Sequence, residues 1–202
     1  MSRVTNLGLN PRRQRSRRAA VLVLDVMTDF AFDGGPAARK ALVGRCSGLV
    51  RLLARARSNG VPVIYVNDSP GAWRSDAPSL VRRFLARLPP DGRCLAGLAP
   101  EPDDLVVLKP RHSAFYATPL DLLLQHLAVS QLVLTGISTE SCVWMTACDA
   151  HIRGFGLVVP LDAVVGTSRT AVAATITGLR RVLQVRTPAR AATLRLAKGR
   201  IG

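Results

Sequence analysis

The feature that most limits the fold of this chain is a series of short apolar runs, each separated from the next by a longer stretch. Residues 20–24 read Ala-Val-Leu-Val-Leu and contain no polar position. A strand without alternation is apolar on both faces, so both faces must be covered, as in a parallel strand between two layers of helices. Such runs predict strands at residues 20–25, 61–66, 105–108, 131–135 and 157–161, with 181–186 as the candidate for a sixth.

Helical stretches fill the gaps between these runs. The longest begins at Pro36, a residue suited to the first turn of a helix, and stops at Asn59-Gly60. Strands that alternate with helices predict an α/β fold, a doubly wound and mostly parallel sheet of about six strands with helices on both faces. The other helices are predicted at residues 79–88, 119–127, 139–153 and 168–180.

The positive charge of the chain is concentrated at its two ends. The formal net charge is +15, yet residues 1–18 hold six Arg and no acid, and residues 163–202 hold eight basic residues and no acid. The part between them is close to neutral, so no basic groove across the domain is expected and nucleic acid is not an expected partner. We predict a basic disordered arm at 1–18, one globular domain at 19–187 and a basic tail, frayed or disordered, at 188–202.

Cysteine usage and apolar run length indicate the compartment. The four cysteines form no CxxC pair, and the charged start of the chain has no small-residue cleavage site after it. The longest apolar runs fall far short of the roughly 20 residues that cross a bilayer. We therefore expect free thiols, a reducing cytoplasm and no membrane partner.

Three unlike polar groups follow three of the predicted strands. Asp25 ends the first, Lys109 ends the third, and Cys142 lies in the first turn of the helix that follows the fourth. The carboxyl ends of parallel strands meet at one edge of a sheet, where the active sites of such folds lie. The sequence therefore predicts that a carboxylate, an ammonium and a thiol come together at this edge.

These three groups suit acyl transfer to water. The first turn of a helix favours a thiolate, so Cys142 is a candidate nucleophile for an amide carbonyl. Asp25 is placed to take the thiol proton, and Lys109 to keep that carboxylate ionised. A buried cysteine is by itself most often a small apolar side chain. The combination at three strand ends is what favours a catalytic role.

The residues around these groups resemble a known family. The motifs that carry the resemblance are Val23-Leu-Asp25-Val-Met-Thr-Asp-Phe30, Val107-Leu-Lys109-Pro-Arg-His-Ser-Ala-Phe115 and Leu134-Thr-Gly-Ile-Ser-Thr-Glu-Ser-Cys142-Val. The chain is similar, over about residues 19–187, to the isochorismatase-like cysteine hydrolases, which include nicotinamidases and carbamoylsarcosine amidases. The resemblance implies a Rossmann-like three-layer domain in which Asp25 is the general base, Lys109 its charge partner and Cys142 the nucleophile.

The resemblance also implies an oxyanion site and a substrate pocket. A cis peptide bond would fall at Ile137–Ser138, in the turn that aims backbone N–H groups, including that of Cys142, at the substrate oxygen. Nicotinamidases of the family hold a metal with histidines after the second strand, but residues 67–73 contain none, so no metal and no cofactor are expected. The candidate pocket residues are Phe30, Asn67, Asp68, Trp73, Arg111, His112 and Phe115.

The function expected from these observations is hydrolysis of a C–N amide bond in a small molecule by an amidase-type cysteine hydrolase. One alternative keeps the fold but acts on a non-amide metabolite such as isochorismate, although relatives with that activity lack the cysteine. Another is a polyanion-binding protein that uses its basic ends. The expected partners are a small amide substrate and further copies of the chain, as a dimer or tetramer.

Overall fold

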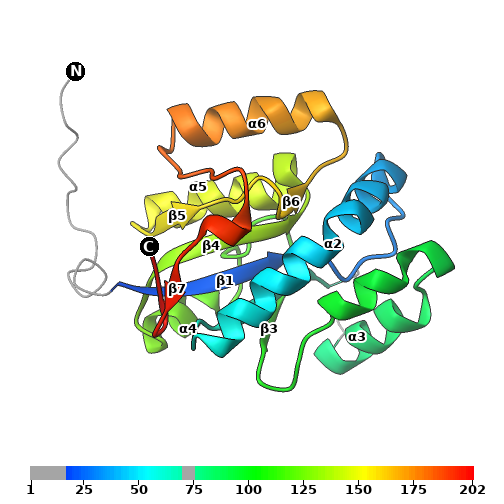
Figure 1. Ribbon diagram of the computed structural model, residues 1–202, viewed down its shortest axis with the longest axis horizontal. Coiled ribbons are helices and arrows are strands. Elements are labelled where there is room, and N and C mark those ends of the chain that lie inside the picture. The colour runs from blue at the N-terminus through cyan, green and yellow to red at the C-terminus, as the bar shows by residue number, and fades with distance from the viewer. Residues whose placement is uncertain (1–16, 70–75) are drawn as a thin grey trace.

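A computed structural model of the chain describes residues 17–69 and 76–202 (Figure 1). The predicted arm at 1–18 therefore lies outside the described residues, except for Arg17 and Arg18. Arg18 is already the first residue of strand β1 (Arg18–Leu24). No helix within the described ranges is both long enough and apolar enough to cross a membrane.

The predicted fold class is confirmed: a mostly parallel sheet carries helices on both faces. Its main path runs β3-β2-β1-β4-β5, and all neighbours along that path are parallel. The sheet has eight strands rather than about six. Residues 181–186 contribute no strand, because only a single bridge joins Arg186 to Val158. The other bounds are β2 Val63–Asp68, β3 Leu105–Lys109, β4 Val129–Ile137, β5 Gly156–Val158 and β6 Val164–Val165.

The unbroken apolar run of β1 is explained by two cores, one on each face of the sheet. Its odd-numbered residues, such as Val21 and Val23, join one core, and its even-numbered residues, such as Leu22 and Leu24, join the other. Both sets are fully buried because period-two side chains meet helices on either side. The first core is covered by α2 (Gly35–Ser58), α3 (Ala77–Ala86) and η1 (Pro90–Leu98), and the second by α4 (Leu120–His126), α5 (Trp144–Ile152) and α6 (Arg169–Arg181).

The C-terminal segment differs from the predicted frayed or disordered tail. It forms the short helix η3 (Ala191–Thr193) and an antiparallel hairpin of β7 (Leu196–Ala197) and β8 (Arg200–Ile201). Strand β8 pairs with the start of β1, and the Ala19 N–H donates to the Gly199 carbonyl at 2.8 Å. The segment is ordered because its aliphatic side chains, Leu194, Leu196 and Ile201, are buried in the core beside α2.

The strand order places a crevice at one edge of the sheet. The chain moves from β1 to β2 and β3 on one side and returns to β4 and β5 on the other. Strands β1 and β4 therefore lie side by side while their following segments turn to opposite faces, which opens a crevice outside their carboxyl ends. Asp25 and the segment that leads to Cys142 flank this point.

Candidate active site

The carboxylate of Asp25 is held rigidly at the end of β1. Its backbone has a φ of 50°, a left-handed conformation that Asp tolerates better than most residues. The Asp25 N–H donates to the Val66 carbonyl at 3.0 Å, and its Oδ1 accepts from the Asp68 N–H at 2.7 Å. Strand β2 thus fixes both the backbone and one oxygen of Asp25, which leaves Oδ2 for the next strand.

Lys109 ends β3 and reaches across to this carboxylate. Its side chain is fully buried, and Nζ lies 2.9 Å from Asp25 Oδ2 and 3.5 Å from Cys142 Sγ, the atom to which it donates. Nζ also donates to Asp68 Oδ1. One ammonium therefore contacts two carboxylates and the thiol, which is the convergence that the strand ends predicted.

Cys142 reaches the same point from β4. The peptide bond between Ile137 and Ser138 is cis, at the position that the resemblance implied. A single π-helical turn, η2 (Thr139–Val143), follows and carries the thiol, before the regular helix α5 begins. Gly136 permits the close approach of β4 to β1, because its φ is 105° and a Cβ there would lie 2.0 Å from the Leu24 carbonyl oxygen.

Burial dominates the charge states of the site. It raises the pKa of Asp25 above its ordinary value, Lys109 opposes that shift, and Asp68 adds to it. Burial would lower the pKa of Lys109, but Asp25, Cys142 and Asp68 outweigh it and the pKa is raised. The ammonium is thus charged at neutral pH, and Asp25 is a stronger base than a solvated aspartate.

The thiol differs from the sequence-based expectation of a stabilised thiolate. Burial, followed by the charge of Asp25, raises the pKa of Cys142 to about 12, and Lys109 only partly offsets this. A helix terminus lowers a thiol pKa mainly where the thiol is partly solvated, whereas Cys142 is only 6% exposed beside two carboxylates. The resting side chain is therefore a neutral thiol that needs a base at the moment of attack.

A cavity of about 460 Å³ opens in front of Cys142. Among the predicted pocket residues, Asn67, Asp68 and His112 line it, and His112 Nδ1 lies 3.8 Å from Cys142 Sγ. Arg111 does not line it. Trp73 lies outside the described residues.

Phe30 and Phe115 do not line the cavity either, because their rings are buried elsewhere. Phe30 packs in the first core, and Phe115 packs in the second beside Phe155 and under the Arg153 guanidinium, 4.8 Å from its ring centroid. The sequence pattern missed the wall that α3 supplies, Leu80, Arg83, Phe84 and Arg87, because this helix is far from the motifs in sequence and only the fold brings it near.

The polar residues at the end of β2 are committed to partners within the chain. Asn67 accepts from the Met27 N–H at 3.0 Å and donates to the Met27 carbonyl at 3.1 Å, so it holds the loop after β1. Asp68 is engaged by Lys109. Among the described residues no group of three or more His, Cys, Asp or Glu side chains is placed to hold a metal ion. These residues do not form a set of metal ligands, and no step below uses a metal.

Glu140 connects the nucleophile turn to a third loop, a role that the sequence did not reveal. Its Oε1 accepts from both the N–H and the hydroxyl of Thr167, at 2.7 and 2.6 Å. Its Oε2 is buried, and a Cβ on Gly166 would lie 2.1 Å from it. Thr167 also packs on Gly34, where a Cβ would come within 2.5 Å of its side chain. Glu140 thereby ties the turn that carries Cys142 to the loops before α2 and α6.

Replacing Glu140 should therefore loosen the turn. We expect Glu140→Ala to lower the free energy of unfolding by about 2 kcal/mol, because two donors at Thr167 lose a charged acceptor. Glu140→Gln retains an oxygen at Oε1 and should recover most of that loss. Urea unfolding of both variants measures the difference in free energy of unfolding. Equal stability of Glu140→Ala and the unmodified chain would contradict the proposed role of Glu140 in holding the turn.

The comparison with known families agrees with the motifs. The family model described as the isochorismatase domain matches residues 19–190. The chain belongs to the isochorismatase family. That assignment covers the whole sheet except the hairpin of β7 and β8.

Individual members of the isochorismatase family resemble the chain over most of its length. It is 34% identical over 149 residues to YaaI of Bacillus subtilis (strain 168), an uncharacterized isochorismatase family protein, covering 74% of this chain and 81% of YaaI. It is 34% identical over 165 residues to the ureidoacrylate amidohydrolase RutB of Methylobacterium radiotolerans, covering 69% of this chain and 64% of RutB. The crystal structure of N-carbamoylsarcosine amidase from Thermoplasma acidophilum matches with a TM-score of 0.63 and 29% identity, over 86% of this chain and 96% of that one.

Proposed function

We propose that this chain is a cysteine amidohydrolase that cleaves a C–N bond of a small amide through a thioester on Cys142. The observation that carries the proposal is the convergence of Asp25, Lys109 and Cys142, of which Asp25 and Cys142 line one cavity. Lys109 Nζ bridges the carboxylate and the thiol from within the protein, while the cavity leaves Sγ open to a ligand. This arrangement provides a base, a nucleophile and a fixed positive charge without any further group.

In the first step the thiol proton moves to Asp25 as Sγ attacks the carbonyl carbon. The raised pKa of Asp25 favours this transfer, because burial makes the carboxylate a stronger base. The raised pKa of the Cys142 thiol opposes the transfer, so the proton moves to Asp25 together with the formation of the C–S bond. When the tetrahedral intermediate collapses, the C–N bond breaks and Asp25 returns the proton to the leaving nitrogen. Water then attacks the thioester while Asp25 takes one of its protons. When this second intermediate collapses, the C–S bond breaks, Asp25 returns the proton to Sγ, the carboxylic acid product leaves, and the Cys142 thiol is regenerated.

The oxyanion of the tetrahedral intermediate needs a donor beside the nucleophile. The N–H groups of Ser141 and Val143 both donate to the Ser138 carbonyl, at 3.2 and 3.1 Å. We assign the backbone N–H of Cys142, which lies between these two groups on the nucleophile itself, as the oxyanion donor within this turn. The Ile137–Ser138 peptide bond leads into the turn and lines the cavity.

The substrate class follows from cavity size and from the relatives. A cavity of about 460 Å³ suits a small molecule rather than a peptide chain. Two relatives are named for ureidoacrylate and N-carbamoylsarcosine, both of which contain a carbamoyl nitrogen. Ureido acids and primary amides of similar size are thus the first substrates to test, by release of ammonia or amine.

The pH dependence of Cys142 alkylation tests the base without knowledge of the substrate. Asp25 acts only when ionised, and its pKa is raised, so the rate of labelling by iodoacetamide should fall as pH drops through a value above the ordinary 3.8 of aspartate. The measurement is peptide mass spectrometry after limited labelling. Asp25→Asn should remove this pH dependence and slow the labelling of Cys142. The labelling rate of Cys94, which is exposed, should not change. An ordinary thiol profile at Cys142, unchanged by Asp25→Asn, would rule out the proposed base.

A further inference from the structure

The C-terminal hairpin gathers basic side chains on one surface. In β7 and β8 the aliphatic residues Leu196 and Ile201 face the core. Three basic side chains are exposed on the hairpin: Arg195 and Arg200 directly precede these aliphatic residues, and Lys198 lies in the turn between the two strands. Because extended backbone sends successive side chains to opposite faces, burying Leu196 and Ile201 places Arg195 and Arg200 on the outside, while the turn presents Lys198 to solvent. The core packing of the hairpin thereby fixes a group of cations that would be dispersed in an unfolded tail.

These cations line a second cavity of about 460 Å³. Of the residues that the structure describes, Arg17, Arg195, Lys198 and Arg200 line its walls and no acidic side chain does. None of the four forms an ion pair with an acidic side chain in the part of the chain that the structure describes. Residues 163–202 contain no Asp or Glu that could balance these positive charges.

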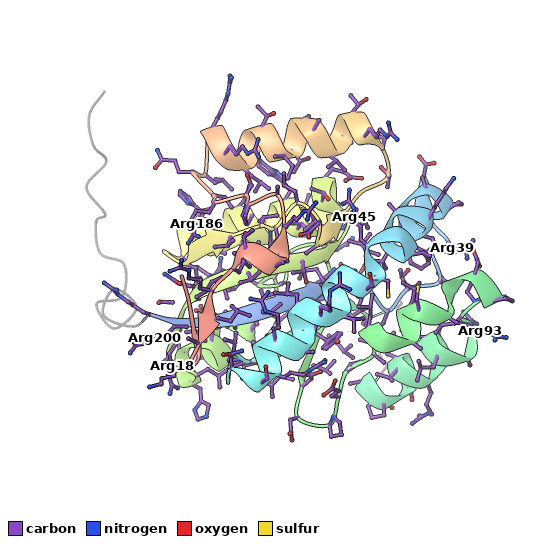
Figure 2. All side chains as sticks on the ribbon, viewed as in Figure 1. Arg18, Arg39, Arg45, Arg93, Arg186 and Arg200 are labelled. Carbon is purple, nitrogen blue, oxygen red and sulfur yellow. The ribbon has the colours of Figure 1, made fainter. Side chains whose placement is uncertain are left out.

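The basic cavity lies at the edge of the sheet opposite to the catalytic residues. Arg200 pairs with Arg18 at the first residue of β1, whereas Asp25 follows the last. Figure 2 shows Arg18, Arg186 and Arg200 at one end of the molecule, and Arg39 and Arg93 at the other. A ligand in this cavity would therefore not compete with a small substrate for the site at Cys142.

The near-neutral central part of the chain did not favour a nucleic-acid partner, but this cavity is built from the basic ends, and we propose that it binds the phosphate backbone of a nucleic acid without reading its sequence. Three of the four cations are Arg, whose planar guanidinium pairs with phosphate oxygens through two hydrogen bonds. No aromatic side chain lines the cavity, so stacking on bases is not provided. The large exposed apolar side chains of the described residues lie outside the hairpin, which therefore has nothing to insert into a lipid surface. Contact with phosphate groups is therefore the mode of binding that the cavity provides, and such contacts do not depend on the nucleic-acid sequence.

The test measures binding of the full chain to a fluorescent DNA duplex of about 20 bp by anisotropy, between about 50 and 200 mM salt. The hairpin variant is Arg195→Gln, Lys198→Gln and Arg200→Gln together. The matched control is Arg82→Gln, Arg93→Gln and Lys40→Gln, which removes the same two Arg and one Lys from exposed positions elsewhere. Both variants keep every residue before Arg17, so any binding by that segment is common to them. Thermal unfolding verifies that each variant is folded.

We expect the hairpin variant to bind the duplex at least about 10-fold more weakly at low salt, and the slope of log K against log salt to become shallower by about 2 to 3. The control variant should retain most of the affinity for the duplex and most of the salt slope. Two sequences of equal length should bind alike. Equal losses of duplex affinity in the hairpin variant and the control variant would overturn the proposal, since net charge alone would then explain binding. Hairpin-dependent binding of inorganic tripolyphosphate or phosphatidylserine vesicles in preference to DNA would also overturn it.

Discussion

Replacing Cys142 with alanine is expected to abolish hydrolysis while leaving the fold intact. The thiol is the only nucleophile among the three converging side chains, so its removal should lower kcat by at least about 10³-fold. The side chain is small and 6% exposed, and its loss should cost only about 1 kcal/mol of folding free energy. The readout is ammonia release from ureido acids and primary amides, with circular dichroism as the check on folding.

Cys148 offers a matched control for this substitution. It lies on α5, the helix that begins after the nucleophile turn, and it does not line the cavity. Cys148→Ala should therefore keep nearly full activity. If Cys142→Ala still hydrolysed a substrate that the unmodified chain cleaves, a covalent thioester at this position would be excluded, whatever the substrate.

Replacing Lys109 with methionine should lower both the free energy of unfolding and the rate of hydrolysis. The ammonium is fully buried between Asp25 and Asp68, and removing one partner of a buried ion pair costs about 3–5 kcal/mol because a charge remains without compensation. Methionine fills similar space, so the loss is mainly electrostatic. Lys40→Met, at an exposed position of α2, should change stability by less than about 0.5 kcal/mol.

The pH dependence of this variant follows from the same charges. Without Lys109 the main opposition to the burial that raises the pKa of Asp25 is lost, and only the hydrogen bond with Cys142 still lowers this pKa, so the folded variant takes up a proton more readily than the unfolded chain. A group with a raised folded-state pKa stabilises the fold increasingly as pH falls. Urea unfolding at pH 7 and at pH 5 should therefore show a smaller difference between the variant and the unmodified chain at the lower pH. A constant difference would mean that Asp25 does not carry the uncompensated charge.

The layered sheet and the three converging groups could be predicted from the pattern of residues along the chain. The unbroken apolar run of β1 requires cover on both faces, whatever the details of packing, and parallel strands bring their carboxyl ends to one edge. Asp25 and Lys109 are separated by 84 positions, yet each directly follows or ends a strand, so topology alone places them together. Local pattern was sufficient here because strand ends are local features.

The charge state of the thiol and the composition of the cavity wall depend on long-range packing and could not be predicted from the residue pattern. The pKa of Cys142 depends on its burial and on the distances to Asp25 and Lys109, which a helix-terminus argument does not contain. Phe30 and Phe115 stand beside catalytic motifs in sequence but turn their rings into the two cores.

The folding of the C-terminal segment also depends on long-range packing. Its high Arg and Ala content is typical of a solvated tail, but three aliphatic side chains at alternating or nearby positions find room beside α2 and pair the segment with β1. Whether such a segment folds depends on an apolar surface supplied by distant residues. Composition therefore determined its charge, and long-range packing determined where that charge is displayed.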